Sequence, residues 1–396
     1  MPDTTTNPPR VFLHVPVALT EARAASGVAG APLAAAVERL RGDAEAVLDA
    51  GPFTVVHPEW VAPSGDPHDY YSFGPYWWPD PASADGLPYI QRDGEMNPVA
   101  DAGNWQAIFG LSDTATTLAE AAWFTGDARY ADRAAVLLRA WFLDEATRMN
   151  PHLEYGQAIP GRVTGRGIGI IDTMRLVPLI DAIGLLAEFP CWTRTDQEGV
   201  EEWFRAYLTW LTTHPYGLQE REEKNNHGTW YDAQVAAFAL FVGDDPLARQ
   251  TIQRSITKRL AAQVADDGSQ PEELWRTRAL TYSVFNGLAL VNLATLGDRV
   301  GVDIWRSPAH GTPSLLRMAR WLAQYADGSP FPYKQIVEPP VEPFVMLIRR
   351  CANAYQDDAL EAALDGITGF DRGTDRVQLT FPRTAAASSN AAPTCG

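Results

Sequence analysis

The stretch AIFGLSDTATTLAEAAWFTGDARYADRAAVLLRAWF, residues 107–142, decides the fold. Its second half repeats apolar residues at spacings of three and four: Ala131, Ala135, Leu138 and Trp141. Between the halves stands Thr125-Gly-Asp127, a link of the kind that ends one helix and begins the next. Residues 107–125 and 128–142 are therefore predicted to form an antiparallel helical hairpin.

The same pattern recurs along the chain. It predicts further helices at residues 32–48, 170–188, 196–213, 230–242, 246–265, 278–296, 313–325 and 341–355. No glycine-rich dinucleotide motif and no alternation of strands with helices is found, which disfavours a Rossmann-type fold. We therefore expect an all-α fold, an α/α toroid or incomplete barrel of antiparallel helical hairpins. A single domain is expected over residues 1–383, with a disordered tail at 384–396.

Composition narrows the function. The 396 residues carry a net charge of −17, which argues against a nucleic-acid partner. Three cysteines without C-x-x-C spacing make a disulfide framework or a zinc site unlikely, and we expect no metal and no cofactor. No apolar run long enough for a membrane span and no secretory signal is recognised. The expected location is cytoplasmic, or secreted if a leader precedes this sequence. A monomer and a homodimer both remain open.

An aromatic segment, HDYYSFGPYWWP at residues 68–79, is the first candidate site. Its prolines, with Pro81 beyond them, argue against a buried regular element. Flat rings on a stiff loop suit sugar rings, so we expect four of them to stack on substrate: Tyr70, Tyr71, Trp77 and Trp78. The alternative is that these rings plug the end of a helical domain.

The segment EEKNNHGTWYD, residues 222–232, is the second. Asn225 or Asn226 can cap the following helix, but capping explains neither His227 nor Gly228. An amide and an imidazole at a helix start suit a carboxylate. We expect Asn226 and His227 to bind one, with Trp230 contacting substrate; the alternative is a cap followed by a structural histidine.

Residues 270–286, QPEELWRTRALTYSVFN, are the third. Arg278 and Tyr282 are four apart and share a helix face, while Arg276 lies nearer the helix start. A cation beside a tyrosine lowers the phenol pKa toward a value usable in a base. The alternative is a buried tyrosine with an ordinary hydrogen bond.

The fourth candidate spans residues 150–172, where four glycines lie within nine residues. No phosphate-loop ending follows them. Arg162 and Arg166 bring positive charge suited to a carboxylate, or they pair with structural acids. We expect Gln157 and Arg166 to contact substrate.

Together these segments resemble a known family. YWWP, GLPYIQRDGEMNP, NPHLEYGQAIPG, GRGIGIID, NNHGTWY and RALTY, in this order over about residues 50–350, are similar to motifs of the alginate-lyase superfamily of helical-toroid polysaccharide lyases. The likeness is closer to the glucuronan-lyase branch, polysaccharide lyase family thirty-eight, than to family five.

The resemblance implies metal-free β-elimination of an anionic uronic-acid polysaccharide or oligosaccharide. It places charge neutralisation on Asn226 and His227 and the catalytic tyrosine at Tyr282. The accompanying arginine maps onto Arg276, with Arg278 as a close rival because helix geometry favours it. Tyr282 would remove the C5 proton and return it to O4 where both lie on one ring face, as in glucuronate and mannuronate. For guluronate or iduronate, His227 would be the base.

Two alternatives remain. A glycoside hydrolase needs two carboxylates flanking the bond, and candidates such as Asp232, Glu272 and Glu273 lie in no recognisable acid/base motif. The other is a catalytically silent sugar-binding protein. A polyanion also requires a basic lining inside an acidic body, for which the candidates are Arg92, Arg162, Arg166, Lys224 and Lys334.

Overall fold

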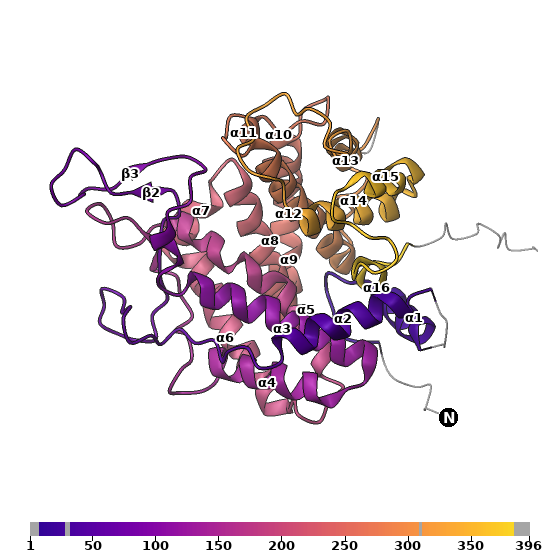
Figure 1. Ribbon diagram of the computed structural model, residues 1–396, viewed down its shortest axis with the longest axis horizontal. Helices are drawn as coiled ribbons and strands as arrows, with labels where there is room; N and C mark the ends of the chain where they lie inside the picture. Colours follow the sequence, from indigo (N-terminus) through magenta and orange to yellow (C-terminus); the bar gives the residue numbers. More distant parts are fainter. Residues whose placement is uncertain (1–7, 28–31, 309–310, 384–396) are drawn as a thin grey trace, which may run out of the picture.

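The computed structural model describes residues 8–27, 32–308 and 311–383. Helices dominate it, and the expected all-α toroid is confirmed (Figure 1). The tail predicted at residues 384–396 lies outside the described residues.

Five long helices form the inner layer of the toroid, and neighbours in the series pack against one another: α3 (Trp105–Thr125), α5 (Leu176–Leu186), α8 (Asn226–Phe241), α12 (Ala279–Val300) and α14 (Val341–Tyr355). They are apolar on nearly all sides because both layers cover them. In α8 every residue except His227 is buried. By length and hydropathy α12 could cross a membrane, yet 78% of its most apolar window is buried within the protein.

The outer layer is formed by helices that pack on the inner ones: α2 (Ala34–Val47), α4 (Ala128–Phe142), α6 (Arg194–Thr213), α9 (Asp245–Ser255), α13 (Ser314–Ala323) and α15 (Asp358–Ala363). The hairpin predicted from residues 107–142 is present as α3 and α4. Gly126 ends α3 in a left-handed conformation, with φ 71°. Asp127 then caps α4 by accepting a hydrogen bond from the Arg129 N–H at 3.0 Å.

Short elements complete the chain: α1 (Pro16–Ser26), α7 (Pro215–Arg221), α10 (Ala261–Gln263), α11 (Pro271–Leu274), α16 (Val377–Thr380), and the 3₁₀ turns η1 (Pro98–Asp101), η2 (Gly167–Arg175) and η4 (Leu364–Gly366). The helix predicted at residues 170–188 begins as η2. Pro178 lies in the first turn of α5, where its missing N–H would have no helical partner, so the α-helix starts only two residues before it. The helix predicted at 246–265 contains a π turn, η3 (Ile256–Leu260).

The aromatic segment does contain regular structure, contrary to expectation. β1 (Tyr71–Phe73) pairs in parallel with β4 (Tyr155–Ala158), and β2 (Trp77–Trp78) pairs antiparallel with β3 (Ile90–Gln91). The prolines bound these strands rather than interrupt them, because each strand is only two to four residues long. The β2–β3 hairpin projects from the helices at one side of the toroid (Figure 1).

Candidate active site

A cavity of about 590 Å³ opens where the β2–β3 hairpin meets the starts of α8 and α12. It collects residues from widely separated segments of the chain. Its lining includes Tyr76, Trp77, Asp93, Gln157, Arg166, Asp172, Asn225, Asn226, His227, Arg276, Arg278 and Tyr282, together with Gln91, Thr281 and the rings of Trp105, Phe109, Trp275 and Phe285. All four residues predicted to be catalytic therefore face one cavity, together with Gln157, Arg166, Arg278 and Trp77 from the predicted binding set.

The start of α8 separates the roles of the two asparagines. Asn225 is the cap, and its Oδ1 accepts a hydrogen bond from the His227 N–H at 3.2 Å. Asn226 is buried and bonded to Glu273: its main-chain N–H donates to Oε1 at 2.7 Å and its Nδ2 to Oε2 at 2.8 Å. One of the two N–H groups of the amide expected to meet the substrate is thus already in use.

His227 is oriented by a second buried carboxyl. Its Nδ1 lies 2.8 Å from Oε1 of Glu220 on α7, and Nε2 has no partner among the described residues. Burial raises the pKa of Glu220. Burial alone would lower the pKa of His227, but the charge and hydrogen bond of Glu220 outweigh it and raise that pKa. The ring is therefore held ready to exchange a proton at Nε2.

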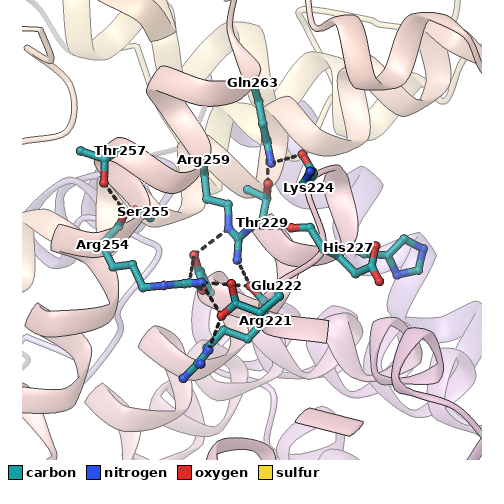
Figure 2. Close-up of polar contacts among 12 residues, drawn as sticks. Arg221, Glu222, Lys224, His227, Thr229, Arg254, Ser255, Thr257, Arg259 and Gln263 are labelled. Carbon is teal, nitrogen blue, oxygen red and sulfur yellow. Dashed lines mark hydrogen bonds and ion pairs between the residues drawn. The ribbon is translucent and has the colours of Figure 1, made fainter. Parts of the chain in front are cut away.

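Three side chains, one each from α9, η3 and α10, hold the link between α7 and α8 (Figure 2). Arg259 donates to the carbonyl oxygens of Arg221 at 2.5 Å and Glu223 at 2.6 Å. Gln263 donates to the Lys224 oxygen at 3.0 Å, and Arg254 to the Arg221 oxygen at 3.0 Å. These bonds satisfy main-chain acceptors that would otherwise be unpaired.

A buried carboxylate on α8 anchors the two arginines. Asp232 accepts from Arg259 Nε at 2.8 Å and from Arg254 Nη1 at 2.9 Å. Arg254 and Arg259 are five residues apart and would diverge on a regular α-helix, whereas the π turn between them adds a residue and returns both to one face.

Gly228 is explained by this arrangement. A Cβ at this position would lie 2.1 Å from the Glu223 carbonyl oxygen and 2.4 Å from Arg259 Nη1. Position 228 requires glycine because the link between α7 and α8 and the Arg259 side chain pass directly over the first turn of α8.

Tyr282 lies in the first turn of α12, with its hydroxyl 2.7 Å from the Tyr76 hydroxyl of the hairpin. The Arg276 guanidinium carbon is 3.8 Å from the centre of its ring. Burial raises the pKa of Tyr282 well above its ordinary value, with Tyr76 adding to the shift, and Arg276 only partly opposes it. The expectation of a net lowered phenol pKa is wrong for the substrate-free protein, because burial outweighs the cation.

The two candidate arginines differ in their partners. Arg276 is buried and donates from Nε and Nη2 to Oδ1 of Asp93, at 3.0 and 2.7 Å. Arg278 forms no ion pair with the described carboxylates, and its Nε is buried without a partner. Of the two, Arg278 is the guanidinium free to receive an anion.

Arg166 is aligned through an amide. Its Nη2 donates to Oε1 of Gln157 at 3.0 Å, and Gln157 Nε2 donates to Oδ1 of Asp172 at 2.9 Å. Gln157 has φ 51°, an uncommon conformation for a residue other than glycine. Asp172 is also bonded by Tyr70 and Ser72, yet burial raises its pKa to about 6.

Several predicted contacts lie elsewhere. Tyr70 is fully buried and bonded to Asp172, and Trp230 is buried against Phe285, so neither can stack on a sugar. Tyr71 packs against Phe73, and Trp78 lies under Arg92; neither lines the cavity. Of the four rings expected to stack, only Trp77 lines the cavity.

The expected basic lining is also largely wrong. Only Arg166 of its five candidates lines the cavity, although Arg162 lies over the Trp77 ring. The positive charge comes instead from Arg166, Arg276 and Arg278, against two aspartates that are already hydrogen-bonded. This makes the cavity locally less acidic than the whole chain.

Sequence reasoning missed the residues that support this site. Tyr76 and Asp93 stand within motifs that were recognised, but their partners are about 180 to 210 positions away. Glu220 and Glu273 carry no local signal beyond being acids near the motifs. Among the described residues, no group of three or more histidine, cysteine or carboxylate side chains is arranged to hold a metal ion.

Comparisons with known proteins show the family. A family model described as Alginate lyase matches residues 57–331. The crystal structure of an alginate lyase from Bacteroides ovatus is 36% identical, with a TM-score of 0.89; the match covers 94% of this chain and 99% of that one.

Two further structures share the fold. Alginate lyase A1-III from Sphingomonas species A1 is 16% identical with a TM-score of 0.55, covering 88% of this chain and 96% of that one. A histidine-to-alanine form of A1-III complexed with a tetrasaccharide is 17% identical, also with a TM-score of 0.55, covering 90% and 98%. None of the curated protein sequences compared with the chain matches it.

Proposed function

The chain belongs to the alginate lyase family, and we propose that its cavity cleaves alginate-type polyuronates by β-elimination. It is a polysaccharide lyase acting on polyuronates. The observation that carries the assignment of the site is the convergence of Tyr282, His227 and two arginines on one cavity.

The first task of such a site is to make the C5 proton removable. That proton is only weakly acidic while the neighbouring carboxylate is ionised, and its loss forms an enolate-like dianion. Arg278 and the Nε2 of His227 are donors without competing partners in the part of the chain that the structure describes, so they are assigned to the carboxylate. Asn226 is assigned as the third donor, through the N–H of its amide that Glu273 does not hold.

The second task is proton transfer to the leaving oxygen. The raised pKa of Tyr282 keeps its hydroxyl protonated, which suits an acid that donates to O4. Where the C5 proton lies on the same ring face, Tyr282 first acts as the base. Its own proton is first lost to solvent, and the phenolate is then stabilised by a hydrogen bond from the Tyr76 hydroxyl, 2.7 Å away, and by Arg276 over its ring.

For uronates whose C5 proton lies on the opposite face, His227 is assigned as the base. Its Nδ1 is held by Glu220, so Nε2 is the nitrogen that accepts the proton. Tyr282 remains the acid in both cases. The choice of mannuronate, guluronate or glucuronate as preferred substrate therefore decides which residue starts the reaction.

Neighbouring sugars are assigned to the hairpin side of the cavity. Trp77 presents its ring there. The guanidinium carbons of Arg162 and Arg166 lie 5.2 and 5.8 Å from the centre of this ring and help to hold it in place. Rings of this kind bind the apolar face of a pyranose, while the arginines attract its carboxylate.

A hydrolase is disfavoured by the same lining. The cavity has two carboxylates, and both are occupied: Asp93 by Arg276, and Asp172 by Gln157 and two hydroxyls. Glu273 and Asp232 are buried in hydrogen bonds elsewhere. Among the described residues that line the cavity, no free pair of carboxylates remains to flank a glycosidic bond.

The test is the ultraviolet absorbance of the unsaturated uronate that a lyase forms, measured with polymannuronate, polyguluronate, glucuronan, hyaluronan and heparosan. Wild type is compared with Tyr282→Phe, for which we expect loss of the signal on every substrate with binding retained. Release of reducing ends without absorbance would instead establish a hydrolase. Oligosaccharide binding without cleavage by the wild type would establish a sugar-binding protein.

A further inference from the structure

Trp275, which directly follows α11, is the tryptophan that the fold leaves in solvent. All 13 tryptophans of the chain lie within the described residues, and Trp275 is the only one of them that is largely exposed, at 68%. A single exposed apolar side chain is ordinary on a protein surface. Trp275 differs because its ring also lines the active-site cavity, where aromatic rings are typical ligand contacts.

The backbone that carries Trp275 is fixed on both sides. Before it, Glu273 of α11 accepts two hydrogen bonds from Asn226 at the start of α8. After it, the main-chain N–H and the hydroxyl of Thr277 donate to Asp93 of the hairpin loop, at 2.9 and 2.7 Å. The indole therefore projects into solvent from a rigid support, which is the arrangement of a preformed binding surface.

Trp275 also lies next to the reacting centre. The Arg276 guanidinium carbon is 5.4 Å from the centre of the Trp275 ring and 3.8 Å from the centre of the Tyr282 ring. A single guanidinium thus contacts both rings. A sugar held on Trp275 is therefore a near neighbour of the sugar whose proton Tyr282 handles.

We propose that Trp275 is a second stacking platform, on which the sugar beside the cleaved uronate lays its apolar face. The polymer is then held on two rings from different elements, Trp77 on the β2–β3 hairpin and Trp275 at the end of α11 (Figure 1). The inference rests on the proposed function, and it names a residue that binds the substrate outside the reacting position. Trp275 touches the substrate but takes no part in proton transfer.

A neutral platform suits a polyanionic substrate on this protein. The chain has a net charge of −17, which repels a polyuronate at long range. Stacking on an indole needs no opposite charge, so salt does not screen it. The factor by which loss of Trp275 raises KM should therefore be the same at low and at high ionic strength. A factor that falls as salt is added would overturn stacking as the mode of contact.

The kinetic test compares Trp275→Ala with Trp275→Phe, which keeps a ring, on oligouronates of increasing length and on the polymer. For Trp275→Ala we expect KM on the polymer to rise about tenfold, the value of one lost apolar sugar face, with kcat little changed. Trp275→Phe should restore most of the loss. The rise should be smaller on the shortest oligomer that is cleaved, because a short chain can bind without reaching Trp275.

Tyr333→Ala is the matched control. Tyr333 is also an exposed ring, on the segment that bonds to the start of α12 through Lys334, but it does not line the cavity. Its loss should leave KM unchanged. An equal fall in kcat at every substrate length in Trp275→Ala would show that Trp275 only supports Arg276, and this would overturn the inference.

Tryptophan fluorescence gives a direct readout. In Tyr282→Phe, which binds without turnover, an oligouronate should protect Trp275 from quenching by acrylamide. Most of this protection should disappear in Tyr282→Phe/Trp275→Phe, and unchanged protection there would overturn the inference. A wild type that forms no unsaturated uronate from any polyuronate would overturn the proposed function instead.

Discussion

Arg276 stacks on the Tyr282 ring, 3.8 Å from its centre, while two of its nitrogens hold Asp93 of the hairpin loop. One side chain thus joins the candidate acid–base residue to the segment that covers it. Its orientation depends on residues about 180 positions away in the sequence.

This relationship separates the two arginines. Arg278→Gln removes a donor assigned to the substrate carboxylate, so we expect KM to rise about 10- to 100-fold, the value of a charge-assisted hydrogen bond. Arg276→Lys and Asp93→Asn disturb Tyr282 instead, so kcat should fall about tenfold with a smaller change in KM. Steady-state kinetics on one polyuronate decides between them. The reverse pattern would assign the carboxylate to Arg276.

Glu220→Gln tests whether Glu220 controls the protonation of His227. Glu220 raises the pKa of His227, so its replacement lowers that pKa, and the imidazolium form is lost at a lower pH than in wild type. NMR titration of His227 measures the shift directly. We also expect KM to begin rising at a lower pH in the variant. An unchanged histidine titration would show that Glu220 does not govern this ring.

Asp172 makes stability depend on pH. Its pKa in the folded protein, about 6, lies above the ordinary value of 3.8. The contribution of Asp172 to the free energy of unfolding is therefore greatest below the pKa that it has in the unfolded chain. It declines by roughly 3 kcal/mol in all as the pH rises through the pKa that it has in the folded protein. Asp172→Asn cannot titrate. Between the two pKa values, urea unfolding of wild type should lose stability relative to this variant.

Gly228→Ala should be poorly tolerated, because its Cβ would meet a main-chain oxygen at 2.1 Å. Overpacking of this kind costs about 1–3 kcal/mol or more and would displace His227. Gly42→Ala in α2 is the control, since nothing lies within 4 Å of its added Cβ. It should raise stability by about 0.5–1 kcal/mol. Thermal unfolding and kcat of both variants provide the comparison.

The two neighbouring tryptophans should differ. Trp77 lines the cavity, whereas Trp78 does not and donates to the Glu95 oxygen at 2.9 Å. We expect Trp77→Ala to raise KM about tenfold or more through lost burial of a sugar face. Trp78→Ala should raise it less, and equal effects would contradict a direct role for Trp77.

The helices were accessible from sequence because their signal is local. Residues 128–142 and 341–355 matched α4 and α14 to the residue, since caps and apolar spacing both lie within the element. The π turn was not accessible. Its evidence is the convergence of Arg254 and Arg259 on Asp232, which no periodicity records.

The site shows the same division. The motifs located Tyr282, His227 and Asn226 in one cavity, but burial could not be told from exposure within an aromatic run. Tyr70 and Trp77 look alike in the sequence, yet one is bonded to Asp172 inside the protein and the other faces the cavity. The sign of the Tyr282 pKa shift was missed for a related reason, because desolvation depends on packing that a motif does not describe.

The π turn at Ile256–Leu260 also means that the reactive geometry depends on a residue count in a helix that never touches substrate. Removing one residue there would restore an ordinary helix and rotate everything beyond it by about 100°. Arg254 and Arg259 would then point in different directions, and the link that carries Glu220 toward His227 would lose its support. In this segment a change of length is more damaging than a change of side chain.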